Sequence, residues 1–413
     1  MKAMSLASEQ HLETTAKPRA LDRLAERLVR QQLEQLQEGS LTIVAGEQSD
    51  HYGESGGKPR ATITVQHADF WSDIAFGGSI GAGEAYMQGA WEVDDLTALV
   101  RLLVRNREVL DGMEGGAASL TRPLQKLFHW VNRNSREGAR RNISAHYDLG
   151  NDFFALWLDE TMMYSSAIFA DPSMSLHEAQ LHRLDKICQR LELQADDHLL
   201  EIGTGWGGLA IHAAQHFGCR VTTTTISQQQ FELAQKRVQA AGLEDRITLL
   251  REDYRDLSGQ YDKLVSIEMI EAIGWKQYDT YFAKCNELLK PGGRLLIQAI
   301  TIAEPQYEEA KRSVDFIQRY IFPGANIPSV SAMTQSIART EDLMTTGLHD
   351  FGRDYARTLR HWRENFFACL EQVKAQGYSD AFIRMWEFYL CYCEGGFEER
   401  ALSDVHLLAE RPV

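Results

Sequence analysis

The stretch that most constrains this 413-residue chain covers residues 199–218. A short apolar run ends at the carboxylate of Glu201, and glycines follow at positions 203, 205, 207 and 208 before a helical pattern begins. This order predicts a strand, a tight turn and a helix N-terminus, and glycines let a ligand lie directly against such a turn. An ordinary strand-to-helix turn has the same pattern, so the interpretation depends on the motifs further along the chain.

Strand-like and helical stretches alternate after Asp196. Strands are predicted at 198–202, 220–225, 247–252, 263–267 and 294–300, and helices at 208–217, 228–241 and 277–288. The alternation predicts an α/β fold, with a parallel, doubly wound sheet that binds ligands at the carboxyl ends of its strands. From residue 303 onward we expect helices and loops that cover this sheet.

The rest of the chain divides into three parts. Residues 1–18 are expected to be a disordered tail. Residues 19–115 are expected to form a small α+β domain that serves as a lipid- or membrane-contact module. Its predicted elements are a helix at 19–36, two strands at 41–45 and 61–66 joined as a hairpin, and a helix at 96–104. Residues 116–145 form a predicted basic linker helix with interleaved aromatics, which suits an anionic membrane surface or a solvated linker equally well.

Composition excludes several classes of function. A net charge of -15 argues against a general nucleic-acid binder. No run of about 18 uninterrupted apolar residues is present, and the first residues lack the apolar core of a signal peptide. Of the six cysteines only Cys391 and Cys393 are close, without the spacing of a metal site. We therefore expect no metal, and a cytoplasmic protein.

The residues at the ends of the second and third strands limit the class of ligand that the loop can bind. Dinucleotide enzymes carry an acidic residue about 20 positions after the glycine loop. Here the second strand ends in threonines, and glutamines follow at 228–230. An uncharged or cationic nucleoside fits this loop better than a diphosphate. After the third strand, Asp253 is placed to accept from the exocyclic amine of an adenine, and Tyr254 to form an apolar wall.

Two later motifs resemble class I S-adenosylmethionine-dependent methyltransferases. They are residues 262–268, at the fourth strand, and residues 288–297, with a Lys-Pro-Gly-Gly turn before the fifth. Further stretches, at 146–154, 163–169, 253–257, 318–324 and 354–362, resemble the cyclopropane-fatty-acyl-phospholipid synthase and mycolic acid cyclopropane synthase family. The resemblance implies a Rossmann-like, mostly parallel sheet with a helical cover and a small N-terminal α+β domain.

The resemblance also implies a reaction. The methyl group of S-adenosylmethionine passes to a cis double bond of a phospholipid acyl chain, and a carbocation forms. A base then removes a proton and a cyclopropane ring closes; in the family this base is a bound bicarbonate. Implied partners are phospholipid acyl chains at the inner face of the membrane, with peripheral association, and a second copy of the chain in a homodimer. Two alternatives stay open: a methylene- or methyl-branched product, and a catalytically silent lipid-binding protein.

Site residues are assigned from the family's motifs. The positions that match cofactor ligands are Tyr164, Ser165, Gly203, Gly205, Trp206, Thr225, Ile226, Gln230, Asp253, Tyr254 and Arg255. The bicarbonate ligands Glu271, Tyr355 and the backbone of Ile300 also match. Two others differ, because Ser166 replaces a cysteine and Gln298 replaces a histidine.

Glu268 replaces a glycine three positions before Glu271, which suggests a different base. A protein carboxylate in or near the bicarbonate position, hydrogen-bonded by Ser166 and Gln298, would have a raised pKa and serve as a better base. Bicarbonate itself is then in doubt. The competing interpretation is that Glu268 points toward the adenosyl ligand or toward solvent.

Overall fold

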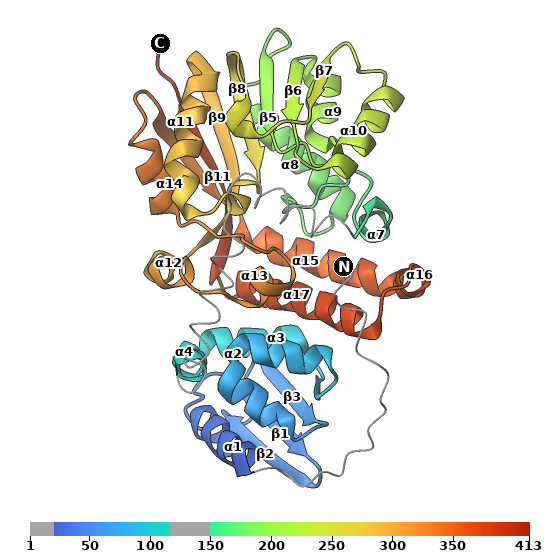
Figure 1. Ribbon diagram of the computed structural model, residues 1–413, viewed down its shortest axis with the longest axis vertical. Helices are drawn as coiled ribbons and strands as arrows, with labels where there is room; N and C mark the ends of the chain where they lie inside the picture. The colour runs from blue at the N-terminus through green and yellow to red at the C-terminus, as the bar shows by residue number, and fades with distance from the viewer. Residues whose placement is uncertain (1–19, 116–148) are drawn as a thin grey trace.

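The computed structural model describes residues 20–115 and 149–413 and arranges them in three tiers (Figure 1). A seven-stranded sheet with its helices forms one end, a pair of long helices lies across the middle, and a smaller domain forms the other end. The predicted tail at 1–18 and the predicted basic helix at 116–145 lie outside the described residues. Within the described ranges no helix has both the length and the apolar character needed to cross a membrane.

The large sheet has the strand order β10-β11-β9-β8-β5-β6-β7. Its strands are β5 (His198–Ile202), β6 (Arg220–Thr224), β7 (Ile247–Leu250), β8 (Tyr261–Ile267), β9 (Leu289–Ile302), β10 (Met344–Asp350) and β11 (Leu402–Glu410). Strands β5 to β9 pair in parallel, which confirms the predicted α/β fold. Their carboxyl ends meet at one edge of the sheet, where ligands of such folds bind.

Strands β10 and β11 correct the expectation that only helices and loops follow residue 303. Both run antiparallel to their neighbours, and β11 pairs with β9 along its whole length. Strand β11 could not be recognised from an apolar pattern, because two of its buried residues, Asp404 and His406, are polar. Strand β10 is an edge strand with mostly exposed side chains, so it lacks an apolar pattern.

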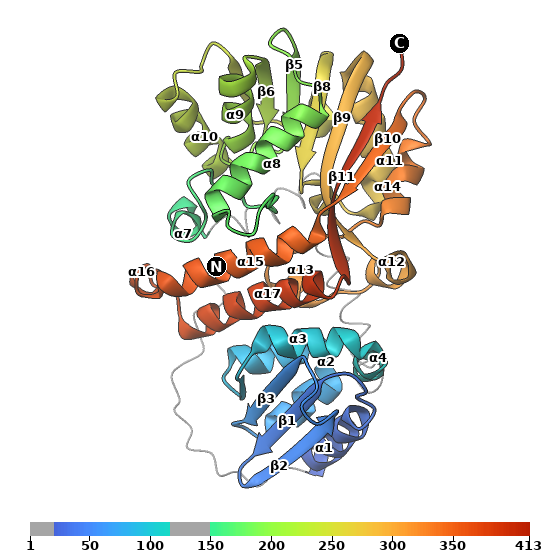
Figure 2. The same cartoon turned by 180° about the vertical axis from the view of Figure 1, so that it is seen from behind.

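Helices cover both faces of this sheet: α11 lies in front of it in Figure 1, and α8 lies in front in the reverse view of Figure 2. The helices of this tier are α8 (Leu176–Arg190), α9 (Gly208–Phe217), α10 (Gln228–Ala240), α11 (Tyr278–Leu288) and α14 (Val330–Ile337), with short 3-10 turns at Tyr254–Asp256, Ile270–Ala272 and Trp275–Gln277. The capping box of Ser175 and Glu178 fixes the start of α8. Helix α9 begins after Gly207, whose φ of 86° lies in the left-handed region that favours glycine.

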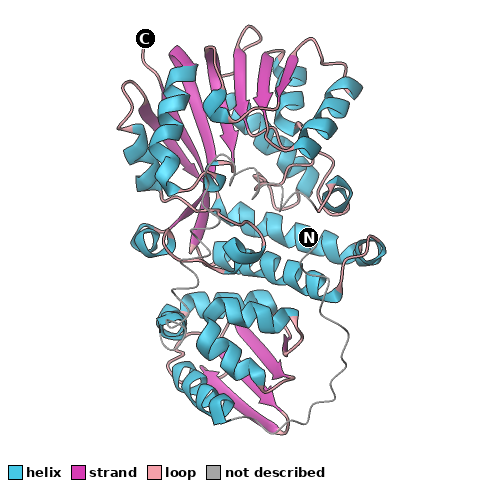
Figure 3. Ribbon diagram, in the orientation of Figure 1, coloured by secondary structure: helices cyan, strands magenta, loops and turns pink. Residues whose placement is uncertain are grey.

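The middle tier is built on α15 and α17, which pack against each other (Figure 3). Its helices are α7 (Asn151–Ala155), α12 (Glu304–Ala310), α13 (Phe316–Tyr320), α15 (Gly352–Ala368), α16 (Leu370–Ala375) and α17 (Asp380–Glu398). Fully buried aromatic side chains hold this tier together, among them Phe153, Trp157, Trp362 and Trp386. Aromatic pairs of this kind add stabilisation beyond the area that they bury.

The small domain carries a separate four-stranded sheet with the order β2-β1-β3-β4. Its elements are α1 (Ala20–Leu33), β1 (Ser40–Ala45), β2 (Gln48–Gly53), β3 (Arg60–Val65), α2 (Asp69–Met87), β4 (Trp91–Val93), α3 (Leu96–Arg105) and α4 (Arg107–Gly115). The predicted hairpin is wrong, because β1 and β3 pair in parallel. Strand β2 forms inside the predicted loop and pairs antiparallel with β1 across a tight turn at Gly46, where φ is 60°. Strand β2 was not predicted because its residues are mostly exposed and polar.

Helices α2 and α3 pack the small domain onto α17. The hydroxyl of Tyr86 donates to Glu387 at 2.8 Å, and Arg101 pairs with Glu399 at 2.6 Å. At Gly83 a Cβ would come within 2.4 Å of the Phe316 ring, so the backbone of α2 approaches α13 as closely as only glycine allows. The small domain and the helical tier therefore form a continuous packed unit.

Candidate active site

One cavity of about 580 Å³ joins the carboxyl ends of the parallel strands to the helical tier. Every residue predicted to hold the cofactor lines it: Tyr164, Ser165, Gly203, Gly205, Trp206, Thr225, Ile226, Gln230, Asp253, Tyr254 and Arg255. The predicted catalytic residues Glu268, Glu271, Ile300 and Tyr355 also line it. Ser166 and Gln298 are fully buried behind the cavity wall.

The glycine loop after β5 forms one end of this cavity. Gly203, Gly205 and Gly207 have φ values of 107°, 52° and 86°, which residues with a side chain rarely adopt. The indole of Trp206 donates to Asn151 at 2.7 Å, and the guanidinium of Arg237 donates to the Trp206 carbonyl at 2.8 Å. These contacts fix the loop against α7 and α10.

The following strand ends complete the cradle. The Thr225 hydroxyl donates to the Gln230 side-chain oxygen at 2.8 Å, so these two residues occupy the place where dinucleotide enzymes carry a carboxylate. Arg255 holds Asp253 through two bonds of 2.8 and 2.6 Å. The side-chain oxygens of Ser165 and Tyr254 are buried in the cavity lining without a partner among the described residues. Buried polar atoms of this kind require a partner, so the cradle fits a polar nucleoside such as S-adenosylmethionine.

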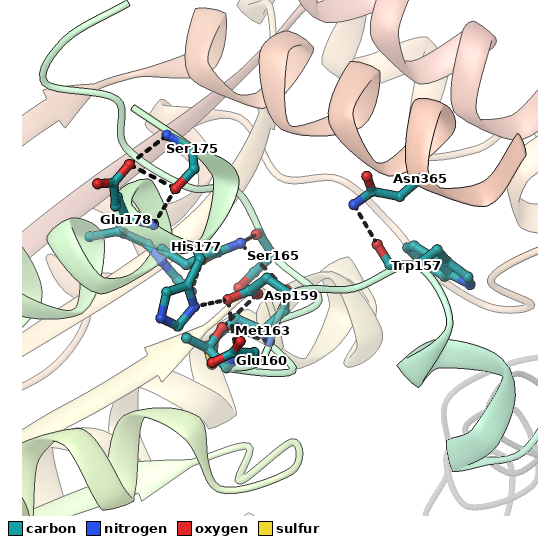
Figure 4. A network of polar contacts seen from close by, with 12 residues as sticks. Trp157, Asp159, Glu160, Met163, Ser165, Ser175, His177, Glu178 and Asn365 are labelled. Atoms are coloured by element: carbon teal, nitrogen blue, oxygen red, sulfur yellow. Dashed lines mark hydrogen bonds and ion pairs between the residues drawn. The ribbon is translucent and has the colours of Figure 1, made fainter. Parts of the chain in front are cut away.

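The segment that carries Tyr164 and Ser165 is held by its own polar network (Figure 4). Asp159 meets His177 at 2.9 Å, and Asn365 on α15 donates to the Trp157 carbonyl at 3.0 Å. Deeper in the protein, the Gln180 amide donates to the Ser165 carbonyl at 2.9 Å. Because the segment is anchored to both α8 and α15, the cofactor site and the helical tier are positioned together.

Glu268 leaves the end of β8 with a φ of 45°, which is uncommon for a residue with a side chain and costs about 1–2 kcal/mol. Its carboxylate accepts three hydrogen bonds, each of 2.8 Å: Oε1 from the Ser166 backbone N–H and the Gln298 amide, and Oε2 from the Tyr355 hydroxyl. The Ser166 hydroxyl instead donates to the Ala167 carbonyl at 3.0 Å. Three of the residues predicted at the anion site, Ser166, Gln298 and Tyr355, therefore bind the Glu268 carboxylate.

Gln298 is oriented by two polar neighbours on its far side. Its side-chain oxygen accepts from the buried guanidinium of Arg183 at 3.2 Å and contacts His406 Nε2 at 3.0 Å. A guanidinium only donates, so the amide nitrogen of Gln298 must face Glu268. His406 then donates through Nε2, while its Nδ1 accepts from Arg190. Burial lowers the pKa of His406 well below its usual value, which agrees with a neutral ring.

Glu271 is the second carboxyl group at the cavity. Its Oε1 accepts from the Ile300 backbone N–H at 2.6 Å, and its buried Oε2 has no partner among the described residues. Burial, together with the charge of Glu268, raises the pKa of Glu271 to about 8. Glu271 is therefore mostly protonated at neutral pH and can donate a hydrogen bond into the cavity.

The aromatic side chains near the cavity divide into two groups. Phe153 and Phe154 pack in the aromatic core rather than along the cavity, whereas Phe322 and Tyr389 line it. Glu201 is buried beside the glycine loop but outside the lining, where it accepts from Thr223 at 2.6 Å.

Sequence reasoning missed the buried polar residues behind the cavity wall: Gln180, Arg183, Asp404 and His406. Asp404 and His406 are two positions apart on β11 and therefore lie on the same face of the strand. Only a correct prediction of that strand would have identified them.

Comparisons with known proteins agree with this geometry. The family model for mycolic acid cyclopropane synthetase matches residues 134–407. The chain belongs to this family. It is 40% identical over 335 residues to tuberculostearic acid methyltransferase UfaA1 of Mycobacterium tuberculosis, covering 79% of this chain and 77% of that protein. It is 37% identical over 350 residues to cyclopropane-fatty-acyl-phospholipid synthase of Escherichia coli, covering 84% and 87%.

A solved structure agrees as well. Mycolic acid cyclopropane synthase CmaA1, complexed with SAH and CTAB, superposes with a TM-score of 0.61 at 28% identity, covering 66% of this chain and 98% of that one. The chain is thus a class I methyltransferase that uses S-adenosylmethionine and methylates lipid acyl chains.

Proposed function

We propose that this enzyme transfers the methyl group of S-adenosylmethionine to a cis double bond of a phospholipid acyl chain and closes a cyclopropane ring, with Glu268 as the base. The observation that carries the proposal is the Glu268 carboxylate, held by three donors in the wall of the cavity. A general base must lie within reach of the proton that it removes, and Glu268 lines the space that the cofactor and the acyl chain would share.

The cavity offers room for an acyl chain. Beyond the cofactor cradle it continues between α2, α3 and α17 into the small domain, along an arm lined mainly by apolar side chains. Residues of this arm include Ile74, Ala82, Leu99, Leu103, Phe388 and Tyr392. A methylene group loses about 0.8 kcal/mol of stabilisation when it moves from apolar surroundings into water. Because the arm is apolar like the lipid layer, a long chain avoids this cost when it leaves the layer and places its double bond beside the cofactor.

S-adenosylmethionine supplies an electrophilic methyl group on a sulfonium centre. The residues of this chain orient the reacting groups, exclude water from them and place a negative charge beside them. Tyr164, Trp206 and Tyr389 form aromatic walls that exclude water, and the Glu268 carboxylate stabilises the positive charge that develops on the methylated chain. Glu268 then takes the proton, and the electron pair of the broken C–H bond forms the C–C bond that closes the ring.

Bicarbonate is not needed in this proposal. The donors of Ser166, Gln298 and Tyr355 are already used by Glu268, and the Ile300 N–H is used by Glu271. A further anion would also lie beside the charge of Glu268 in a largely buried space, which electrostatics disfavours.

A methylene-branched chain is the second candidate. A base fixed on the protein removes whichever proton faces Glu268, and the similar Mycobacterium tuberculosis protein is named a tuberculostearic acid methyltransferase. If a hydride first moves from the methylated carbon to the neighbouring cationic carbon, the methylated carbon becomes the cation. Loss of a proton from the added methyl group then forms a C=C bond and leaves a methylene branch, which a separate reduction converts to a methyl branch. Attachment to the inner membrane face, a cytoplasmic location and a homodimer remain predictions.

Product analysis tests the function. Purified protein is incubated with methyl-labelled S-adenosylmethionine and vesicles of phospholipid with cis-monounsaturated chains; vesicles with saturated chains are the matched control. We expect a mass gain of one CH₂ unit per unsaturated chain, and NMR then separates the ring from a methylene branch of equal mass. Cofactor binding without any mass gain would refute the proposal and favour a silent lipid-binding protein.

A further inference from the structure

Asp404 lies one layer behind the candidate base. It is fully buried on β11 and does not line the cavity. Its Oδ2 accepts from the Gln298 amide nitrogen at 3.0 Å, and the same nitrogen donates to Glu268 Oε1 at 2.8 Å. The register of β9 with β11, which sets Asp404 opposite Ile300 and His406 opposite Gln298, produces this arrangement. Two carboxyl groups therefore converge on one amide nitrogen.

The two carboxyl groups lie within hydrogen-bond reach of each other. The buried cation in this layer, Arg183, donates to the oxygens of Gln298 and Gln180 at 3.2 and 2.8 Å rather than to either carboxylate. If both carboxylates were ionised, they would repel each other in a dry space. Asp404 Oδ1 would also remain buried without a donor among the described residues.

One proton on Asp404 removes this repulsion. A protonated Asp404 is a donor, and Glu268 is an acceptor within its reach. The charge belongs on Glu268, because that carboxylate has three other donors, whereas among the described residues the Asp404 carboxyl accepts only from the Gln298 amide. Burial, with the charge of Glu268, raises the pKa of Asp404 well above its usual range.

Charged and titratable groups surround the pair. Arg183 on α8, Glu271 after β8 and Tyr355 on α15 interact with it directly, whereas Tyr389 on α17 interacts with Tyr355, and neutral His406 on β11 contacts Gln298. The pKa of Glu268 lies above its usual value because the group is buried, and the hydrogen bonds from Ser166, Asp404 and Tyr355 offset part of this rise. Asp404 thus acts on the base through a hydrogen bond rather than by contact with substrate.

We propose that Asp404 is a positioning residue for the methyl-transfer reaction: it carries a proton in the resting enzyme and donates it in a hydrogen bond to Glu268, so that the pair bears a single negative charge. This inference rests on the proposed function of Glu268 as the base. When Glu268 accepts the proton from the methylated chain, the pair becomes neutral, and loss of one proton to solvent restores the resting state.

Two substitutions separate this role from simple packing. Asp404→Asn keeps the size, a donor toward Glu268 and an acceptor for Gln298, so the acid limb of the kcat/KM pH profile should stay within about half a pH unit of the parent. Asp404→Val removes the donor. Because loss of a hydrogen bond to a charged group raises the pKa of that group, the acid limb should move up by about one to two pH units. An acid limb that falls by a unit or more in Asp404→Asn would show an ionised Asp404 and overturn the proposal. An unchanged acid limb in Asp404→Val would mean that Asp404 contributes only to packing, and it would also overturn the proposal.

Infrared spectroscopy tests the proton without turnover. The difference spectrum between parent and Asp404→Asn should show the loss of a carbonyl stretch of a protonated carboxyl group, distinct from the component lost in the control Glu271→Gln. No such loss in Asp404→Asn would overturn the proposal. If the parent transfers no methyl group, the proposed function fails, and the infrared comparison still decides the protonation of Asp404.

Discussion

Substituting Glu268→Gln is the sharpest perturbation of the proposed mechanism. The glutamine oxygen can still accept from the Ser166 N–H and the Gln298 amide, which lie 2.8 Å from Glu268 Oε1 in the parent. Its amide nitrogen then faces the Tyr355 hydroxyl, which can turn to accept instead of donating. The hydrogen-bond network therefore survives almost unchanged, while the group that takes the proton is lost.

A positioned general base contributes about 10²–10⁴-fold to a rate, so kcat should fall by this factor, equivalent to about 3–5 kcal/mol. The assay is the initial rate of labelled-methyl transfer to vesicles of unsaturated phospholipid. Thermal unfolding and the affinity for S-adenosylhomocysteine, which lacks the sulfonium charge, should remain close to those of the parent. The matched control is Glu201→Gln, a buried glutamate outside the cavity lining. A Glu268→Gln enzyme that keeps a third or more of the parent rate in carbonate-free buffer would refute the role of Glu268.

Three further outcomes are expected. Tyr355→Phe removes a 2.8 Å hydrogen bond to Glu268, so the acid limb of kcat/KM should move up by about one to two pH units, and an unmoved limb would contradict that contact. Ala82→Phe places a ring in the apolar arm of the cavity, so transfer to phospholipid should fall at least tenfold with cofactor affinity unchanged; equal turnover would exclude the arm as the acyl site. Burial raises the pKa of Glu201 from 4.5 to about 8, so the folded state keeps a proton that the unfolded chain loses between these values, and stability falls as the pH rises through this window. The melting temperature of Glu201→Gln should thus exceed that of the parent by more at pH 8 than at pH 5, and an equal difference at both would contradict the burial argument.

The parallel part of the sheet could be predicted because its strands carry short apolar runs separated by helical patterns. The glycine loop and the threonines after β6 likewise identify a cofactor cradle from local sequence alone. Strands β2 and β10 escaped prediction because they are exposed edge strands whose backbone pairing, rather than an apolar pattern, determines them. Strand β11 escaped because burial of its polar residues depends on partners far away in the chain.

The candidate site divides in the same way. Glu268 was recognised from its own position, because it replaces a glycine within a familiar motif. Its contacts with Tyr355 and Gln298 follow from the sheet edge and the helix above it. Asp404 and Arg183 could not be predicted, because the register of β9 with β11 and the packing of α8 bring them behind Gln298. Local sequence carries no signal for such long-range contacts.

The most direct test of a protein carboxylate as the base is the dependence of the rate on bicarbonate. Initial rates are measured for the parent and for Glu268→Gly in carbonate-free buffer, with and without added bicarbonate. Glycine suits the φ of 45° at this position and frees the donors of Ser166, Gln298 and Tyr355 for an anion. The parent rate should not respond to bicarbonate, whereas the weak activity of Glu268→Gly should rise with it. A parent rate that increases with added bicarbonate would contradict the proposed mechanism.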